Sequence, residues 1–151
     1  LSTGFNRQAD EIEVALHALL ARSQREQFST IVEGVHVRPS IIKDFTLPSD
    51  AIVVPLLIAA DRERTLKAFF RGRAISAPRR GRKHYLDNIE AIWDLQTLLV
   101  SDAETNGVPI VVNEAEGGSM ITRMYSLISA AVLKASPLQS PRSLSMHQGL
   151  G

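Results

Sequence analysis

A carboxylate, a glycine and a histidine interrupt an apolar run near the amino end of the chain. Residues 30–37 read Thr-Ile-Val-Glu-Gly-Val-His-Val, and the β-branched residues predict a strand buried on both faces, as in a parallel sheet. Glu33 does not suit a buried strand, because an unpaired buried carboxylate is costly. In open α/β sheets ligands gather at the carboxyl ends of strands, where a carboxylate can hold Mg²⁺ or accept a proton from a substrate hydroxyl. Glu33 is therefore a candidate for either role, and Gly34 lets a ligand come close; the alternative is a satisfied strand-end glutamate beside an ordinary turn.

A dense cluster of basic residues at positions 62–84 is the second feature that could do chemistry. It holds nine of the seventeen basic residues and a single acid, Glu63, whereas the rest of the chain has eight basic and fifteen acidic residues. The basic residues of this window are Arg62, Arg64, Lys67, Arg71, Arg73, Arg79, Arg80, Arg82 and Lys83. Because the net charge of the whole chain is only +1, this local excess indicates an anionic ligand.

A strand-end carboxylate and an arginine-rich segment together supply what phosphoryl transfer needs. Mg²⁺ held by a carboxylate bridges phosphate oxygens, while arginines neutralise charge on the transferring group. Gly72, Pro78 and Gly81 interrupt the helical pattern and predict a mobile segment, which suits a lid that excludes water. Guanidinium groups bind phosphate in a bidentate way, so the best lid residues are Arg71, Arg73, Arg79 and Arg80. Charge alone leaves open a solvated basic face or a nucleic-acid patch.

Alternating helices and strands are expected to position these residues. Helices are predicted over 8–27, from Asp61 through Phe70, over 85–106 and over 119–134; strands over 30–37, 55–59 and 108–112; and a short helical turn at Ile41 and Ile42. The second strand begins at Pro55 because proline donates no ladder hydrogen bond. Asn106-Gly107 is a helix-stop signal. The alternation is typical of an α/β fold with a parallel sheet and flanking helices.

Composition places the chain among ordinary globular domains. It has 151 residues, 44% of them hydrophobic, which is enough for one domain with a core. The lack of cysteine excludes a disulfide scaffold and a cysteine-ligated metal site. No apolar run reaches the roughly 20 residues that span a bilayer, and residues 1–4 show no signal-peptide pattern. We therefore expect a cytoplasmic protein without a membrane partner, ordered over 1–135 and disordered over 136–151.

Several of these motifs resemble 2-phosphoglycerate kinase and its relatives, from about Phe5 to Leu133. The resemblance is carried by Ile31-Val32-Glu33-Gly34-Val35-His36, the strand from Pro55 to Ala59, the basic lid, Arg82-Lys83-His84-Tyr85 followed by Ile89, Ile92 and Gln96, and Gly107-Val108-Pro109 leading to Asn113. A strand-end Glu-Gly is shared with nucleoside and phosphoribulose kinases. The pattern through Tyr85, Ile92 and Gln96 is more specific to this group.

The resemblance implies a P-loop fold like that of nucleoside monophosphate kinases. It also implies transfer of the γ-phosphate of ATP, with Mg²⁺, to a small phosphorylated hydroxy acid. Glu33 would serve the metal or the acceptor hydroxyl, and His36 would orient the acceptor, although a structural hydrogen bond explains His36 equally well. Asn113 would lie by the loop that touches adenine. The residues expected to contact phosphate are Arg38, Arg71, Arg73, Arg79, Arg80, Arg82 and Lys83.

One part of the family pattern is missing: no Gly-x-x-x-x-Gly-Lys-Ser/Thr loop occurs in the chain, and this loop cradles the nucleotide phosphates. In the family it precedes the position of Leu1 and follows a strand that would lie between the strands at Ile31 and Pro55. We therefore expect residues 1–135 to be the carboxyl-terminal portion of a kinase domain, incomplete on its N-terminal side, with a lid at about 71–84. The intact protein would be the enzyme, and this chain alone would be inactive.

The sequence is also compatible with two functions other than a kinase. A remnant of the kinase fold could bind an anion, such as an inositol phosphate, without transferring phosphate. Nucleic-acid binding is the least favoured, because the window 62–84 has few aromatic residues for stacking beyond Phe69 and Phe70.

Overall fold

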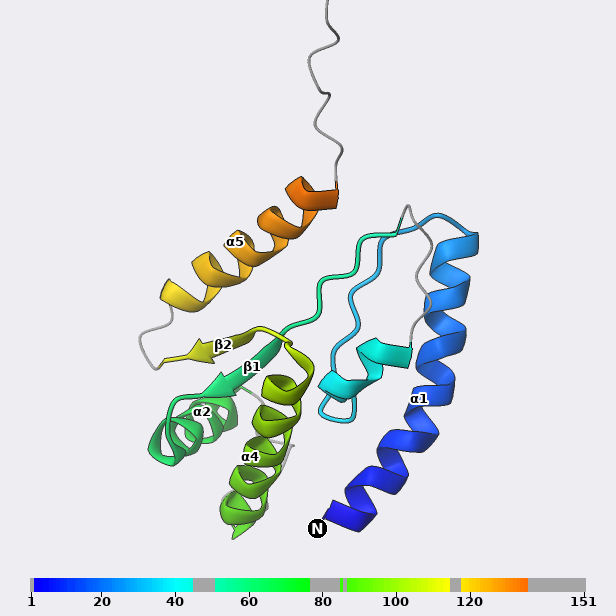
Figure 1. Cartoon of the computed structure of the whole chain (residues 1–151). Coiled ribbons are helices and arrows are strands. Elements are labelled where there is room, and N and C mark those ends of the chain that lie inside the picture. Colours follow the sequence, from blue (N-terminus) through cyan, green and yellow to red (C-terminus); the bar gives the residue numbers. More distant parts are fainter. Residues whose placement is uncertain (1, 45–50, 77–84, 86, 115–117, 136–151) are drawn as a thin grey trace, which may run out of the picture.

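The computed structural model describes residues 2–44, 51–76, 85, 87–114 and 118–135 (Figure 1). Its elements are the helix α1 (Ser2–Arg25), the 3-10 helix η1 (Pro39–Asp44), the strand β1 (Leu57–Ala60), the helices α2 (Glu63–Ser76) and α4 (Ile89–Asn106), the strand β2 (Ile110–Asn113) and the helix α5 (Gly118–Ala135). This confirms the predicted α/β class with parallel strands and flanking helices. The membership in the P-loop fold stays a prediction.

The two strands pair in parallel, from Leu57 beside Ile110 to Ala60 beside Asn113. Parallel strands need a long crossover, and here it runs through α2 and α4. Each strand begins shortly after a proline, and the Leu57 N–H donates to the Pro109 carbonyl at 2.9 Å. The carboxyl ends of both strands therefore meet at one edge of the sheet, next to the start of α2.

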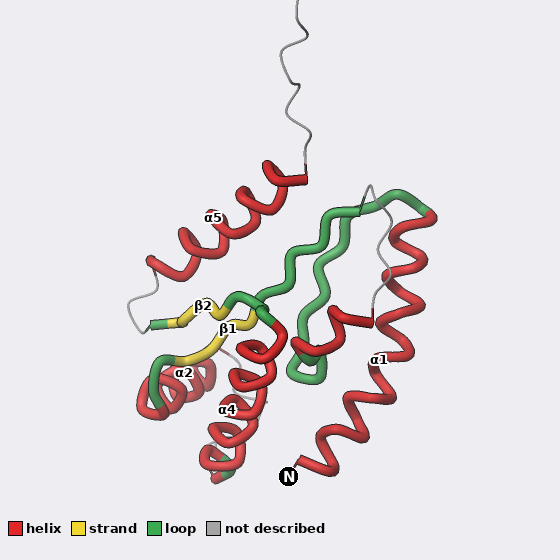
Figure 2. Tube along the Cα trace, viewed as in Figure 1, coloured by secondary structure: helices red, strands yellow, loops and turns green. Residues whose placement is uncertain are grey.

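The prediction of a strand over residues 30–37 is wrong. Residues 28–34 are irregular chain, and a turn follows in which the Val37 N–H donates to the Gly34 carbonyl at 3.1 Å; Figure 2 draws this whole segment as loop. Ile31 is 95% exposed. The β-branched residues favour extended chain, but a strand also needs a neighbour for its backbone groups, and the sheet of the described residues has only β1 and β2.

The main hydrophobic cluster joins α1 to α4 and the start of β1. Phe5 and Ala9 of α1 pack with Leu99 of α4, and Leu57 and Leu95 border them. This explains why α1 begins at Ser2 and not at the predicted residue 8: the apolar stripe extends back to Phe5. A second buried point is Val111 of β2, which is 1% exposed.

The remaining helices begin close to their predicted positions, but α2 continues through Gly72 to Ser76, six residues beyond its predicted end at Phe70. The helix break predicted at Gly72 is therefore wrong, because a single glycine is tolerated inside a helix. The helix α4 starts at Ile89, four residues later than predicted, and ends at Asn106; it is capped by Gly107, whose φ of 66° is left-handed. The short turn predicted at Ile41 and Ile42 is η1, and Ile41 is buried. The helix α5 follows β2 but has no buried residue. Among the described helices, none has the length and apolarity that a bilayer crossing requires.

Candidate functional site

A pocket of about 540 Å³ lies at the carboxyl edge of the sheet. It is lined by Ile58, Ala59, Ala60, Leu66, Ala68, Phe69, Phe70, Gly72, Gln96 and Asn113. We call it the sheet-end pocket. Most of this lining is apolar and comes from β1 and α2, while Gln96 and Asn113 contribute polar amides. Its size falls within the roughly 300–1,000 Å³ of small-molecule sites, and mostly apolar walls with few polar groups are typical of them.

Asn113 reaches the pocket because it is the last residue of β2 and lies opposite Ala60 in the sheet register. Its side chain is half-buried. A carboxamide can both donate and accept hydrogen bonds, so this residue can recognise the edge of a polar ring. The predicted nucleotide-contacting residue thus lines a pocket of suitable size.

Gln96 on α4 holds the end of β1. The Ala60 N–H donates to its Oε1 at 2.8 Å, and its Nε2 donates to the Ala60 carbonyl at 3.1 Å. In the sequence, Gln96 stood out only as part of a family pattern. No sequence signal connects it to Ala60, which lies 36 residues away.

Asp61 is a carboxylate that directly follows β1, at the position where the sequence predicts a helix to begin. A hydrogen bond from Thr65, aided by one from Arg62 at 2.5 Å, lowers the pKa of Asp61 from its ordinary 3.8. Thr65 is buried, so the first turn of α2 holds the carboxylate in place. A negative group therefore lies at the carboxyl end of a strand that is part of the sheet.

Glu33 lies on irregular chain and is exposed. It directly precedes Gly34, where an added Cβ would lie 3.7 Å from a methyl group of Val37. That is an ordinary contact, so the fold does not demand a glycine at position 34. The catalytic and metal-binding role of Glu33 stays a prediction.

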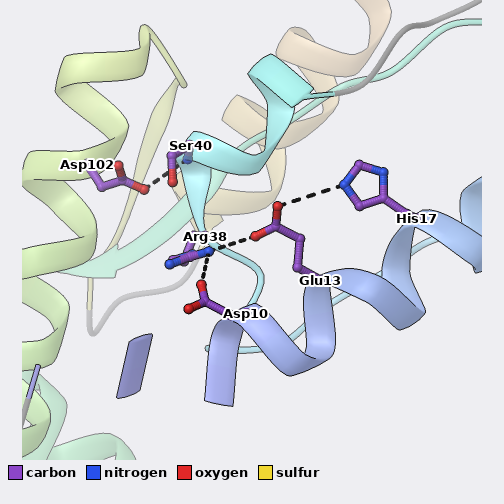
Figure 3. Close-up of polar contacts among 6 residues, drawn as sticks. All are labelled: Asp10, Glu13, His17, Arg38, Ser40 and Asp102. Atoms are coloured by element: carbon purple, nitrogen blue, oxygen red, sulfur yellow. Dashed lines mark hydrogen bonds and ion pairs between the residues drawn. The ribbon is translucent and has the colours of Figure 1, made fainter. Parts of the chain in front are cut away.

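Arg38, one of the predicted phosphate ligands, is engaged by two carboxylates of α1 (Figure 3). Its Nη2 donates to Glu13 Oε2 at 2.6 Å and to Asp10 Oδ1 at 2.7 Å. The hydrogen bond to Glu13 raises the pKa of Arg38, against an opposing effect of burial. Glu13 also faces His17 Nε2 at 3.8 Å. In this arrangement the guanidinium fastens its loop to α1.

His36 also contacts α1. Its Nε2 lies 3.1 Å from Gln8 Oε1, and its ring stacks on Phe5 with centroids 5.2 Å apart. A further link joins the next turn to α4, since the Ser40 N–H donates to Asp102 Oδ2 at 2.9 Å (Figure 3). The loop that carries Glu33 and Gly34 is therefore anchored on its carboxyl side. The hydrogen bond from His36 to Gln8 is a structural contact, which is the alternative role given for His36 in the sequence.

The basic segment is described only in part. Arg71 is on α2 and exposed, whereas Arg79, Arg80, Arg82 and Lys83, the middle of the predicted lid, lie outside the described residues, as do the side chain of Arg73 and the tail 136–151. On either side of residues 77–84, Phe70 and Tyr85 stack with ring centroids 4.9 Å apart and an interplanar angle of 5°. This stack ties α2 to the residue on the far side of the basic segment.

The comparisons with known proteins agree on one group. The chain is 30% identical to the 2-phosphoglycerate kinase of Methanopyrus kandleri over 132 residues, which is 87% of the chain and 40% of the relative. It is 31% identical to the one from Thermococcus kodakarensis over 110 residues, 73% of the chain and 36% of the relative. It is 25% identical to the one from Pyrococcus furiosus over 129 residues, 85% of the chain and 41% of the relative.

No protein-family model and no solved structure matches the chain. These relatives share the name 2-phosphoglycerate kinase as well as their similarity to this sequence, which confirms the resemblance that its motifs predicted. Over most of its length the chain is similar to the archaeal 2-phosphoglycerate kinases, and it spans about two fifths of their length.

Proposed function

We propose that this chain is part of an ATP-dependent kinase that transfers the γ-phosphate of ATP to the hydroxyl of a small phosphorylated acid, as the name 2-phosphoglycerate kinase states for its relatives. The similarity across 73–87% of the chain is the observation that carries this proposal. The topology supports it, because ligands of parallel α/β sheets bind at the carboxyl ends of the strands. The sheet-end pocket lies at that edge.

Mg²⁺ fits the residues present. Kinases usually hold this ion through one or two carboxylates plus the substrate phosphates and waters, so the lack of a three-ligand cluster among the described residues is no obstacle. Glu33 is exposed beside a glycine that the fold does not require, which suits a carboxylate that a phosphate approaches closely. When bound, the ion would neutralise charge on the phosphates. Glu33 would hold it or accept the proton of the acceptor hydroxyl.

The other predicted residues take the remaining tasks. The adenine of ATP would rest in or beside the sheet-end pocket, with the Asn113 amide at its edge. Arg71, Arg73, Arg79 and Arg80 would stabilise the charge of the transferring phosphoryl group, with Arg82 and Lys83 beside them. His36 and Arg38 would contact the acceptor, and to do so each would have to exchange its contact on α1 for a substrate group.

The proposal requires a phosphate-binding loop that these 151 residues do not contain. It therefore concerns the intact protein, and it expects this loop in the protein's remaining sequence. The deciding experiment is to express the complete reading frame and to measure ADP formation with ATP, Mg²⁺ and 2-phosphoglycerate, with glycerate and 3-phosphoglycerate as competing acceptors. We expect acceptor-dependent ADP formation from the complete protein and none from residues 1–151. A complete protein that forms no ADP with any acceptor would refute the proposal.

The lid assignment has its own test in the complete protein. Replacing Arg79 and Arg80 together by alanine is expected to lower turnover by roughly 100-fold or more, because transition-state charge partners are lost. Arg7→Ala is the matched control, since Arg7 is an exposed arginine whose side chain is 85% accessible. Unchanged turnover in the double variant would exclude these arginines from catalysis.

The excess of basic residues at positions 62–84 supports a second candidate, an anion-binding module without transfer. Titration calorimetry with inositol hexakisphosphate separates the two. If the complete protein binds inositol hexakisphosphate with micromolar affinity and forms no ADP, the anion-binding module is favoured over the kinase.

A further inference from the structure

The strand β1 has two edges, and β2 occupies one of them. Backbone groups of successive residues in a parallel strand point alternately to the neighbours on either side. The Leu57 N–H donates to the Pro109 carbonyl at 2.9 Å, so Leu57 and Ala59 point toward β2. Ile58 and Ala60 therefore point to the opposite edge, which we call the free edge of β1. Within the described residues no strand pairs with it.

The backbone groups of Ile58 and Ala60, which both point to the free edge, differ in their hydrogen bonding. Both polar groups of Ala60 are bonded to the Gln96 amide, with the N–H donating at 2.8 Å and the carbonyl accepting at 3.1 Å. At Ile58, two residues earlier, no described strand pairs with the backbone on this edge. A carboxamide offers one acceptor and two donors, so its side chain satisfies the N–H and carbonyl that a neighbouring strand would otherwise bond. On the free edge, the backbone groups of Ile58 therefore have no strand partner among the described residues, whereas those of Ala60 are bonded to Gln96.

We propose that Gln96 is a positioning residue that ends the free edge of β1 one pair early. A strand that joins this edge can then bond to Ile58 but not to Ala60, and must turn away before the carboxyl end of β1. Under the proposed function, on which this inference rests, that turn is where the phosphate-binding loop begins. Gln96 would thus set the depth at which the loop presents its amides, next to the sheet-end pocket that Gln96 itself lines.

The first test is the structure of the intact wild-type protein. We expect the strand beside β1 to make its last backbone hydrogen bond to Ile58, with the Gln96 amide still on Ala60. A ladder that includes Ala60, with Gln96 displaced, would overturn the proposal. This result does not depend on activity, so it is distinct from failure of the proposed kinase function, which would show as an intact protein that forms no ADP.

The second test uses variants of the intact enzyme. Gln96→Leu keeps much of the side-chain volume but leaves Ala60 free to pair with a strand. We expect KM for ATP to rise about 10-fold, because the loop would no longer present its amides at the depth that Gln96 sets. KM for the acceptor should change less than about 2-fold, because the acceptor does not depend on the loop. Thr97→Val is the matched control, since among the described residues the Thr97 hydroxyl donates to the Trp93 carbonyl of its own helix at 3.0 Å. Equal changes in both KM values, or none, would overturn the proposal.

Gln96→Glu supplies a readout that a general packing defect would not give. An ionised carboxylate can accept from the Ala60 N–H but cannot donate to the Ala60 carbonyl, whereas a protonated carboxyl can do both. The rise in KM for ATP, measured relative to wild type at each pH, should therefore shrink as the pH falls toward about 5, closer to the ordinary glutamate pKa of about 4.3. A defect independent of pH would overturn the assignment.

Discussion

Arg38 offers the sharpest test of how the Glu-Gly loop is held in place. Its Nη2 bonds to Glu13 at 2.6 Å and to Asp10 at 2.7 Å. The side chains of Arg38 and Glu13 are each 22% exposed, whereas that of Asp10 is 64% exposed. The Glu13 bond is therefore partly shielded from water and contributes more than the Asp10 bond. Replacement of Arg38 by methionine removes both bonds while keeping an apolar stem of similar length.

The magnitude follows from these exposures. A hydrogen bond to a charged group in a shielded place is worth about 1.5–3 kcal/mol, and an exposed ion pair about 0–1 kcal/mol. We therefore expect Arg38→Met to lower the free energy of unfolding by about 2–3 kcal/mol. With a urea m-value of about 1–3 kcal/mol/M, the unfolding midpoint should fall by roughly 1 M.

The assay is urea unfolding followed by far-ultraviolet circular dichroism at neutral pH. Arg7→Met is the control, because the Arg7–Glu11 pair is 3.7 Å long with side chains 85% and 71% exposed, and it should change stability by less than about 0.5 kcal/mol. If Arg38→Met unfolds at the wild-type midpoint but loses affinity for a phosphorylated acid, Arg38 is a ligand-binding residue and the structural role argued from Figure 3 is wrong.

Three further predictions concern the elements that carry the site. The pKa of Asp61 is lowered in the folded protein, so its contribution is present above the unfolded value near 3.8 and is lost as the pH falls through the folded value; Asp61→Asn should flatten the acid limb of a stability-versus-pH curve, and an unchanged limb would contradict this. Gly107→Ala places a Cβ on a left-handed residue with φ of 66° and no neighbour within 4 Å, so backbone strain alone should lower the free energy of unfolding by about 1–2 kcal/mol. Thermal melts measure this loss, and Gly118→Ala, at a helical glycine with equally open surroundings, is the control without such strain. Val111→Ala at a side chain 1% exposed should cost roughly 2 kcal/mol in transfer and cavity terms, and a loss below about 0.5 kcal/mol would mean that the β2 core is loosely packed.

Elements with a strong local pattern could be predicted from the sequence. The apolar run after Pro55 and the run after Pro109 are β1 and β2, and Asn106-Gly107 ends α4. These features depend on residues that are neighbours in the chain, so the local sequence is enough to predict them. The strand predicted at 30–37 failed for the opposite reason, because pairing depends on a second strand that the pattern does not show.

The sequence predicted the position of one residue of the sheet-end pocket, but none of the long-range contacts near it. Asn113 was placed at a strand end by its own run, and it lines the sheet-end pocket. The Gln96–Ala60 bonds and the Arg38–Glu13 bond join residues 36 and 25 positions apart, and no periodicity reports such a pair. Asp61 lies between a strand and a helix. The sequence predicted it only as the start of that helix, because its place at a strand end depends on how the sheet pairs.

The exposed apolar surface bears on how the sheet is completed in the intact protein. Parallel sheets are normally covered on both faces, and a pair of strands is marginal on its own. Yet Ile31 is 95% exposed, Ile58 is 46% exposed, and Ile121 and Tyr125 of α5 are 67% and 72% exposed. These side chains lie on different elements, but each belongs to a run whose composition suits burial. A strand at the free edge of β1 would supply the backbone partner that Ile58 lacks among the described residues, and it is also what the proposed kinase requires to carry its phosphate-binding loop.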